Sequence, residues 1–389
     1  MKTSHLRLAR LAGLAALLLL ASCAGKTAED LRDPVPEALV QAAALPGYGH
    51  IRYWGDDGTS ISPVSIALLG DQQTKNPKRS LLVVSGGGSN GAFGAGVLCG
   101  WTVSGSRPEF NIVTGISTGS LVAPFAFLGP AYDEQLKEAY TEISGNDIYR
   151  KKGVLAALGT DSVADNSPLR NLVARYVTDA MVMAIAREYA RGRRLLIGTT
   201  NLDAERPVVW DIGAIAASGQ PGRKQLIQDV LVASASIPGV FPPVRIKVMA
   251  EGKTYDELQV DGGTSNQAFL FPSNLALRAI DKSHQSQRER TLYIIRNGKV
   301  TPEYSQVKPR AVAIAGKAIA SLIRTQGIGD LYRMYANAQR DGIAFNALWV
   351  PASFQATEPE PFDPAYMNQL FDLGYRIGKT ASGWAHQPP

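Results

Sequence analysis

The sequence predicts an α/β protein with a three-layer α/β/α arrangement around a mainly parallel central sheet. Hydrophobic residues make up 45% of the 389 residues and charged residues 19%, which is typical of a packed globular chain. Short, wholly apolar runs alternate with helical patterns along the chain. Two of these runs lead directly into glycine-rich turns, as buried parallel strands commonly do where they pass into helices.

The first 22 residues have the pattern of a bacterial lipoprotein signal peptide. Lys2, Arg7 and Arg10 precede an apolar run over residues 11–20, which is shorter than the roughly 20 residues that span a bilayer. The run ends in Leu-Ala-Ser-Cys, which resembles the box in which the cysteine becomes the lipid-bearing first residue. We therefore expect lipidation at Cys23 and, because Ala24 follows it, sorting to an outer membrane.

Removal of this peptide changes the charge and organisation of the chain. The formal net charge falls from +6 to +3, because three basic side chains and no acidic ones are lost, so charge does not predict nucleic-acid binding. Cys99 becomes the one unmodified thiol of the mature sequence. We expect residues 23–78 to form a tether and a short packed segment, and residues 79–389 to form the main domain.

Strand and helix patterns alternate through the main domain. Residues 81–84 form a short buried strand that opens onto glycines, and residues 110–114 form the second such strand. Helical patterns cover 92–101, 117–127 and 364–379. Further strands are predicted at 194–199, 207–210, 244–248, 258–260, 292–295 and 347–350.

The first glycine loop, residues 85–94, fits more than one motif. Gly86, Gly88 and Gly91 satisfy the G-x-G-x-x-G spacing of dinucleotide-binding loops. That function needs an acidic residue at the end of the next strand, whereas Glu109 precedes it. A phosphate-binding P-loop needs Lys-Ser/Thr after its last glycine, where this chain has Ala92 and Phe93. We therefore expect no nucleotide cofactor.

Both loops contain G-x-S-x-G, with Ser89 in the first and Ser117 in the second. Ser117 has the context of a nucleophile elbow, because it lies between an apolar strand and a helix with glycines on either side. The three glycines before Ser89 indicate that the first loop has a role other than supplying the nucleophile. Backbone amides of Gly86, Gly87 and Gly88 can turn toward one point, as an oxyanion hole requires.

A serine nucleophile needs a base, and the histidines are poorly placed for that role. His50 and His386 lie near the ends of the mature chain, and His284 lies in a charged stretch, although Ser117, Asp261 and His284 would have the order of an α/β-hydrolase triad. Asp261 instead follows an apolar strand and precedes two glycines. This pattern suits either an ordinary turn or a carboxylate at the carboxyl edge of the sheet.

Taken in order, these motifs resemble the patatin-like phospholipase family. The matching stretches are 86–91, 115–119, 168–170, 198–203, 233–243 and 261–263, and the resemblance covers about residues 80–380. It implies a Ser-Asp dyad without histidine, with Ser117 as the nucleophile, Asp261 as its base and the amides of Gly86, Gly87 and Gly88 as the oxyanion hole. It also implies a lipid ester substrate. Because no cluster of His or Cys has the spacing of metal ligands, we expect no metal, and we expect no cofactor.

One residue departs from the family pattern, which has Arg or Lys where this chain has Asn90. We expect a membrane-anchored acyl hydrolase acting on phospholipid or related esters. The alternatives are a hydrolase with a His284 triad and a catalytically weak, lipid-binding envelope lipoprotein, which the presence of Asn90 favours.

A helix is also predicted to carry Arg310, Lys317 and Arg324 on one face and apolar residues on the other. It would either lie at a lipid interface or pack its apolar face on the core.

Overall fold

The computed structural model describes residues 32–62, 66, 78–152, 161–285 and 288–389. The signal peptide and Cys23 lie outside the described residues. Among the helices that are described, none is both long and apolar enough to cross a membrane.

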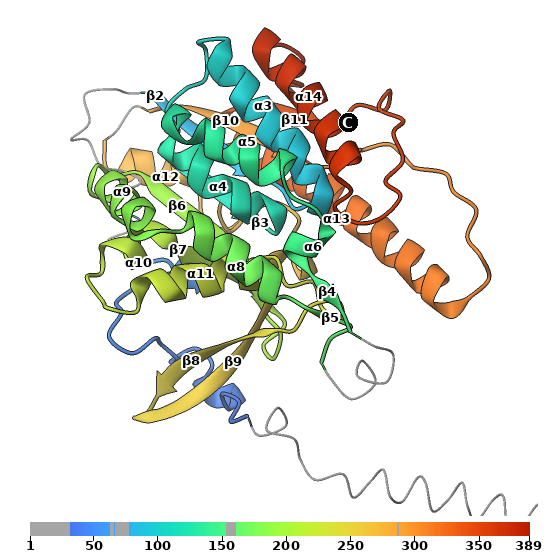
Figure 1. Cartoon of the computed structure of the whole chain (residues 1–389). Helices are drawn as coiled ribbons and strands as arrows, with labels where there is room; N and C mark the ends of the chain where they lie inside the picture. Colours follow the sequence, from blue (N-terminus) through green and yellow to red (C-terminus); the bar gives the residue numbers. More distant parts are fainter. Residues whose placement is uncertain (1–31, 63–65, 67–77, 153–160, 286–287) are drawn as a thin grey trace, which may run out of the picture.

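A single large sheet forms the middle layer of the protein (Figure 1). Its strand order is β1-β7-β6-β3-β2-β10-β11, and β6, β3, β2, β10 and β11 are parallel to their neighbours within this group. The hairpin of β8 and β9 joins the sheet where β9 pairs with the end of β6. The strands are β1 (Arg52–Trp54), β2 (Lys78–Val84), β3 (Ile112–Ile116), β6 (Arg194–Asn201), β7 (Arg206–Asp211), β8 (Val244–Ala250), β9 (Lys253–Asp261), β10 (Glu289–Arg296) and β11 (Ala344–Trp349). A separate two-stranded sheet pairs β4 (Arg150–Lys151) with β5 (Ala164–Asp165).

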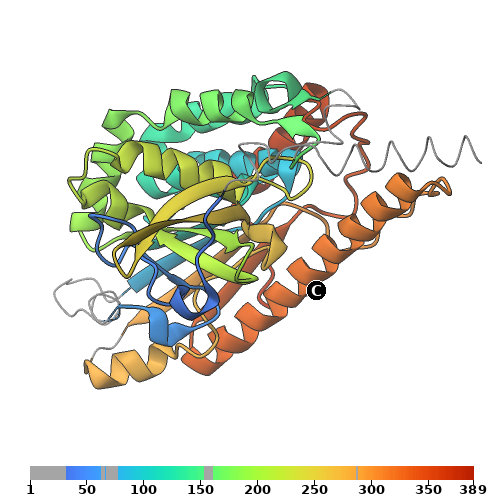
Figure 2. The same ribbon diagram turned by 90° about the horizontal axis from the view of Figure 1, so that it is seen from below.

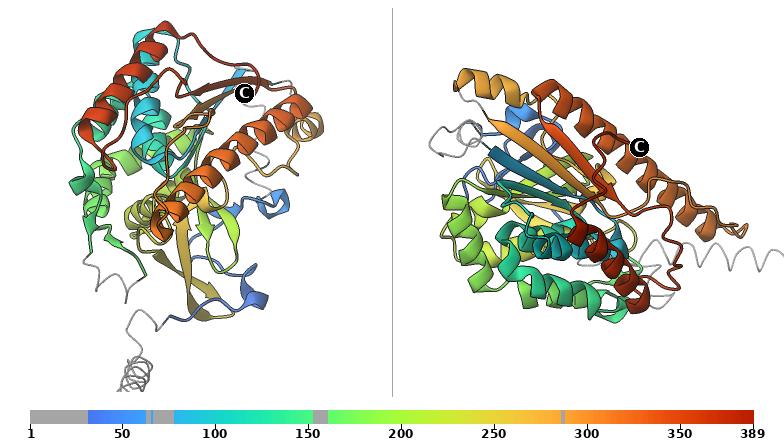
Figure 3. Two further views of the ribbon diagram at one scale, coloured as in Figure 1. Left: turned by 90° about the vertical axis from the view of Figure 1, so that its right-hand side faces the viewer. Right: turned by 90° about the horizontal axis from the view of Figure 1, so that it is seen from above.

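Helices cover both faces of this sheet, as a three-layer fold requires (Figures 2 and 3). One face carries α3 (Gly91–Val103), α4 (Thr118–Leu128), α5 (Asp133–Thr141), α8 (Ser167–Tyr176), α9 (Asp179–Ala190), α10 (Ile212–Ala217), α11 (Arg223–Ser234) and α14 (Pro364–Thr380). The short helix α6 (Gly145–Ile148) contributes to the same layer. The other face carries α12 (Leu277–Ser283) and α13 (Ala311–Asp341).

Alternation along the central strands explains this layering. In β2, Leu82 and Val84 belong to the apolar cluster under α3 and α4, whereas Leu81 and Val83 belong to the cluster under α12 and α13. Successive side chains of a strand point to opposite faces, so a wholly apolar strand needs cover on both. The apolar runs of the sequence therefore account for the third layer.

The amino-terminal segment is part of the same sheet. Strand β1 pairs antiparallel with β7, and Ala44 forms a bridge with Met249 of β8. The expected division near residue 79 therefore does not separate two structural units, because the edge of the sheet is completed by residues that precede it.

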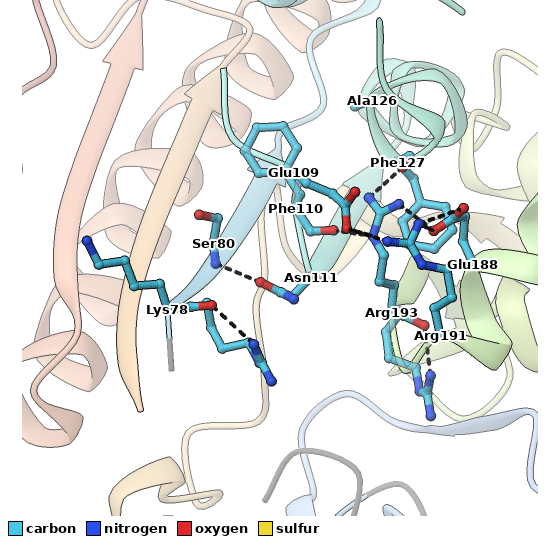
Figure 4. Close-up of polar contacts among 12 residues, drawn as sticks. Lys78, Ser80, Glu109, Phe110, Asn111, Ala126, Phe127, Glu188, Arg191 and Arg193 are labelled. Atoms are coloured by element: carbon cyan, nitrogen blue, oxygen red, sulfur yellow. Dashed lines mark hydrogen bonds and ion pairs between the residues drawn. The ribbon is translucent and has the colours of Figure 1, made fainter. Parts of the chain in front are cut away.

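At the amino-terminal ends of β2, β3 and β6, Arg193 holds the sheet to the neighbouring helices (Figure 4). Its guanidinium donates to the carbonyl oxygens of Phe110 and Phe127 at 2.8 and 2.6 Å, and it pairs with Glu188 at 2.9 Å. These contacts join the end of α4, the start of β3 and the end of α9. Because Arg193 is buried, they fix the far end of the helix that begins at Ser117.

Candidate active site

The pairing of β6 places Ser117 beside Asp261. Strand β3 runs along one edge of β6 until Ile116, which is paired with Gly198. At the next residue of β6, Thr199, the partner is Asp261 of β9. The chain leaves the sheet at Ser117, so beyond this point β9 replaces β3 as the partner of β6. The two predicted site residues are therefore neighbours.

Ser117 occupies a strained turn between β3 and α4. Its backbone has φ 53° and ψ −127°, an uncommon conformation for a residue with a side chain. Its N–H donates to Ser234 Oγ at 3.1 Å, and that hydroxyl in turn donates to the carbonyl oxygen of Gly198 at 2.7 Å. A Cβ at Gly119 would lie 2.2 Å from the carbonyl oxygen of Val84, so the turn needs glycine there. The strain and close packing are those of a nucleophile elbow.

Asp261 is buried, and its two carboxyl oxygens differ. Oδ1 accepts a hydrogen bond from the N–H of Gly263 at 2.7 Å. Oδ2 is buried without a well-formed hydrogen bond from any described residue. Burial raises the pKa of Asp261 to about 7, and hydrogen bonding by the Ser117 side chain and the Gly263 amide opposes this rise. The Ser117 hydroxyl is therefore within reach of the carboxyl, although the contact is looser than a regular hydrogen bond, as is common before substrate binds.

The glycine loop after β2 faces this pair, but its three amides are not equivalent. A Cβ at Gly86 would lie 3.3 Å from Ser117 Cβ, so the loop passes directly beside the nucleophile. The Gly86 N–H already donates to the carbonyl oxygen of Gln267 at 3.0 Å. The prediction that Gly86 supplies an oxyanion donor is therefore corrected: its amide is used to hold the loop. The amides of Gly87 and Gly88 have no acceptor among the described residues and remain available.

Asn297 clamps the glycine loop from the side of β10. Its Nδ2 donates to the carbonyl oxygen of Ser85 and its backbone N–H donates to Ser85 Oγ, both at 2.9 Å. Its Oδ1 accepts from the Gly94 N–H at 3.0 Å. A Cβ at Gly87 would lie 2.1 Å from the Asn297 carbonyl oxygen, so only glycine fits there. Sequence reasoning missed Asn297, although a polar residue between an apolar strand and a glycine is the pattern that singled out Asp261.

Gln267 holds the loop from the other face of the sheet, and sequence reasoning missed it too. Its Nε2 donates to the carbonyl oxygen of Gly263 at 2.9 Å and to Gln326 Oε1 of α13 at 3.1 Å. Its backbone N–H donates to Asp330 Oδ2 at 2.7 Å. Asp330 is a buried carboxylate of α13 whose pKa is raised by burial. No sequence pattern links residue 267 to α13, because the contact is purely tertiary.

The residues after the glycines make structural contacts with the carboxyl-terminal part of the chain. Ser89 Oγ accepts a hydrogen bond from the Phe362 N–H at 2.9 Å. Asn90 Oδ1 accepts one from the Tyr366 hydroxyl of α14 at 2.8 Å. Ser89 is thus occupied by a backbone group, and Asn90, the residue that departs from the expected family pattern, contacts α14.

The three histidines of the described chain lie at the amino-terminal ends of the parallel strands, away from Ser117 and Asp261 at the carboxyl ends. His284 follows α12 and contacts the carbonyl oxygen of Ile280, before β10 begins. His386 contacts the carbonyl oxygen of Phe345 near the start of β11, and His50 lies beside Arg194 at the start of β6. A strand of this length separates the two edges by roughly 20 Å. The alternative with His284 as the catalytic base is therefore wrong for this structure.

Two cavities adjoin the site region. An apolar one of about 50 Å³ begins at Thr118, next to Ser117, and is lined by Leu121, Phe125 and Leu172 among others. A larger one of about 730 Å³ lies on the α13 face and includes Phe269, but neither Ser117 nor Asp261 lines it. Within the described ranges, no group of three or more His, Cys, Asp or Glu residues could hold a metal ion.

Residues 82–272 match the sequence model of the family described as patatin-like phospholipase. This part of the chain is therefore a patatin-like phospholipase domain. The general class of its activity is therefore lipid acyl hydrolysis.

Solved structures provide two further comparisons. The chain is similar to VipD from Legionella pneumophila, with 12% identity over 79% of this chain and 67% of that chain and a TM-score of 0.39. It is also similar to the structure of full-length SpcU in complex with full-length ExoU from the type III secretion system of Pseudomonas aeruginosa. That match has 12% identity, covers 79% of this chain and about half, 52%, of the other, and has a TM-score of 0.21. No match was found among curated proteins.

Proposed function

We propose that the protein is a carboxylic ester hydrolase that cleaves acyl chains from phospholipid or related lipid esters with a Ser117-Asp261 dyad. The observation that carries this proposal is the succession of β3 and β9 along one edge of β6, which sets a strained serine beside a buried carboxylate. The free amides of Gly87 and Gly88 lie in the loop that passes Ser117.

The mechanism follows from these positions. Ser117 Oγ attacks the ester carbonyl carbon while its proton passes to Asp261 Oδ2, the oxygen without a regular partner. The amides of Gly87 and Gly88 donate to the oxyanion, each contributing about 2.7–4 kcal/mol to transition-state stability, and the amino terminus of α4 adds its dipole. Asp261 returns the proton to the leaving alcohol. It then takes a proton from the water that attacks the acyl-enzyme and gives it to Ser117 Oγ as the fatty acid leaves, which restores the free enzyme.

The apolar cavity beside Thr118 supports a lipid substrate. Its lining comes from α4, α5, α8 and neighbouring helices, so an acyl chain bound there would lie in the helical layer next to the nucleophile. Phe125 lines this cavity, whereas Phe127 is fully buried in the core and Phe269 lines the larger cavity on the other face. Because its volume is about 50 Å³, lining side chains must move to admit a long chain.

Fatty-acid release from mixed phospholipid micelles tests the dyad. The chain beginning at residue 24 keeps every described residue, and we expect Ser117→Ala and Asp261→Asn each to lower kcat by about 10³-fold or more. Ser89→Ala removes one of the two acceptors for the Phe362 amide, the other being Glu358 Oε1, so most activity should remain. A dead Ser89→Ala variant with an active Ser117→Ala variant would place the nucleophile in the other loop. A wild-type chain inert on phospholipids, lysophospholipids and simple esters would favour a lipid-binding envelope protein.

We also propose that Cys23 carries a lipid anchor, which holds the enzyme in the bacterial cell envelope, at the outer membrane. This proposal is supported by the sequence of the first 24 residues alone.

A further inference from the structure

The amino-terminal half of α13 extends away from the body of the protein (Figures 2 and 3). The carboxyl-terminal half packs on the sheet through Leu331, Met334 and Ala338. Residues 313–325, in contrast, are exposed or half-buried throughout. The helix starts on the side of the sheet to which the loop after β10 leads, which is the carboxyl edge that holds Ser117.

The amphipathic pattern of this half is reversed relative to a core-packed helix. Ile314, Ile319, Leu322 and Ile323, here called the apolar stripe, fall within one half of the helical circumference. Their exposed fractions are 54%, 53%, 69% and 39%. A surface helix of a globular protein turns its apolar face to the core. The expectation of a core-packed apolar face is therefore wrong for this stretch, and the solvated side is the apolar one.

The basic side of the same helix is turned toward the protein. Lys317 and Arg324 are half-buried on the side opposite the apolar stripe. Lys317 Nζ donates to the Glu303 carbonyl oxygen at 3.0 Å and to Ser305 Oγ at 2.7 Å, so it ties the helix to the loop that precedes it. The apolar stripe is thus held outward by specific contacts.

The surroundings of the stripe are strongly basic. Residues 299–325 contain five Lys or Arg side chains against one carboxylate, Glu303, which pairs with Lys299 at 2.6 Å. Lys308 and Arg310 are exposed, and neither has a carboxylate partner among the described residues. Tyr304 is 91% exposed in the same segment. An apolar face with flanking cations and an aromatic side chain has the chemistry of an element that binds an anionic lipid interface.

The same helix is joined to the candidate active site one turn beyond the stripe. Gln326 Nε2 donates to the carbonyl oxygen of Ser265, four residues after Asp261, at 2.7 Å. Gln326 Oε1 accepts from Gln267, whose carbonyl oxygen holds Gly86. A surface that binds the stripe is therefore held in a fixed relation to Ser117.

We propose that residues 299–325 dock the protein on an anionic lipid bilayer, with the apolar stripe in the interface and Lys308 and Arg310 facing lipid phosphates. The inference rests on the proposed function in one respect only: docking would bring the active site to its phospholipid substrate. Binding to the bilayer itself requires no catalysis.

Vesicle co-sedimentation tests the proposal. Every protein begins at residue 24 and carries Ser117→Ala, so that no lipid is consumed. The variant Ile319→Glu with Leu322→Glu is compared with Val103→Glu with Met183→Glu, which makes the same change at two apolar positions of similar exposure on α3 and α9. On vesicles of equal parts phosphatidylglycerol and phosphatidylcholine, we expect at least about tenfold weaker binding for the stripe variant and unchanged binding for the control. Pure phosphatidylcholine or 1 M salt should weaken wild-type binding.

Activity and assembly separate the possible failures. With Ser117 restored, the stripe variant should lose hydrolysis of vesicle phospholipid but keep hydrolysis of a water-soluble short-chain ester. If no ester is cleaved by any variant, the proposed function fails while the binding result still decides the docking. Equal binding of the stripe variant and wild type, or no binding by either, overturns the proposal. Sedimentation velocity provides a further test. If wild type forms an oligomer that dissociates in the stripe variant while vesicle binding stays the same, the proposal is also overturned, because the stripe would then contact a second copy of the chain.

Discussion

At the scale of single residues, Asp261 is the side chain whose chemistry depends most on its surroundings. Burial raises its pKa to about 7, although the Ser117 side chain and the Gly263 amide stabilise the ionised form. A carboxylate with a pKa near the working pH is both sufficiently ionised and sufficiently basic to take the proton of a serine hydroxyl. The same burial makes the ionised form costly for the folded state.

The pH dependence of kcat/KM follows from this pKa. In the proposed mechanism Asp261 acts as a base only when ionised, so kcat/KM on an uncharged ester should rise close to tenfold per pH unit below about 7 and level off above it. Initial rates from pH 5 to 9 measure this. A profile that is flat between pH 5 and 8 would mean that the base is a carboxylate with an ordinary pKa.

Stability should change with pH in the opposite direction. The folded-state pKa of about 7 exceeds the ordinary value of 3.8, so the folded protein binds the proton more tightly than the unfolded chain. Stability is therefore lost as the pH rises from about 4 to about 7 and is constant above that. Asp261→Asn removes this cost, and at pH 8 it should be more stable than wild type by on the order of 1–4 kcal/mol.

Thermal unfolding of both proteins at pH 4.5 and pH 8 measures the effect. Asp372→Asn, at an exposed position of α14, provides the control. A difference between Asp261→Asn and wild type that is the same at both pH values contradicts the explanation by burial.

At the scale of secondary-structure elements, the site depends on how three strand ends are joined. The ends of β2, β3 and β10 each lead into a loop. The glycine loop is held from both faces of the sheet, because Asn297 donates to the Ser85 carbonyl oxygen and the Gln267 carbonyl oxygen accepts from the Gly86 N–H. Arg193 fixes the far end of α4, at the opposite edge. The loop amides are therefore positioned by side chains that need not touch the substrate.

Asn297→Asp tests the clamp on the glycine loop. The substitution keeps an acceptor for the Gly94 amide but replaces the donor to the Ser85 carbonyl oxygen with a repelling oxygen. We expect kcat to fall by about 100-fold with little change in KM, because a displaced loop misaligns the oxyanion donors. Asn346→Asp is the matched control, since its Nδ2 also donates to a backbone carbonyl oxygen, that of Leu292 in β10. Wild-type kcat in Asn297→Asp would show that the clamp does not position the loop.

At the scale of the whole molecule, the predicted lipid anchor and the apolar stripe would both attach the enzyme to lipid. The anchor would act through one residue near the start of the chain, and the stripe through a helix connected to the active-site loops. An attached enzyme meets its substrate at high effective concentration, while the stripe would set its orientation.

Cys23→Ser tests the anchor. In cells fed a labelled fatty acid, wild type should take up the label and stay with membranes washed in 1 M salt, because covalent acyl chains supply most of a lipoprotein's membrane affinity. The variant should take up no label and be released by that wash, because only the apolar stripe would then hold it on the membrane. Cys99→Ala, which removes the buried thiol of α3, should keep the label. Activity on micelles should be unchanged in both. Label retained in Cys23→Ser would exclude this anchor.

The sequence by itself determined most strands of the large sheet, although not β1 at its edge, together with the layers and the candidates for catalysis. Wholly apolar strands such as residues 81–84 must be covered on both faces, and a serine between glycines at a strand-to-helix turn can be recognised locally. The family follows from the order of such local motifs, and the match over residues 82–272 confirms it.

Only the tertiary structure decided which groups meet. It brought Asp261 beside Ser117 through β6, placed His284 at the other edge, used the Gly86 amide to hold the loop, and recruited Asn297 and Gln267 from distant elements. It also turned the apolar side of α13 outward, which periodicity cannot reveal because a helical pattern shows that two faces differ but not which one is covered. Contacts between residues far apart in sequence depend on strand register and packing, and no local pattern encodes these.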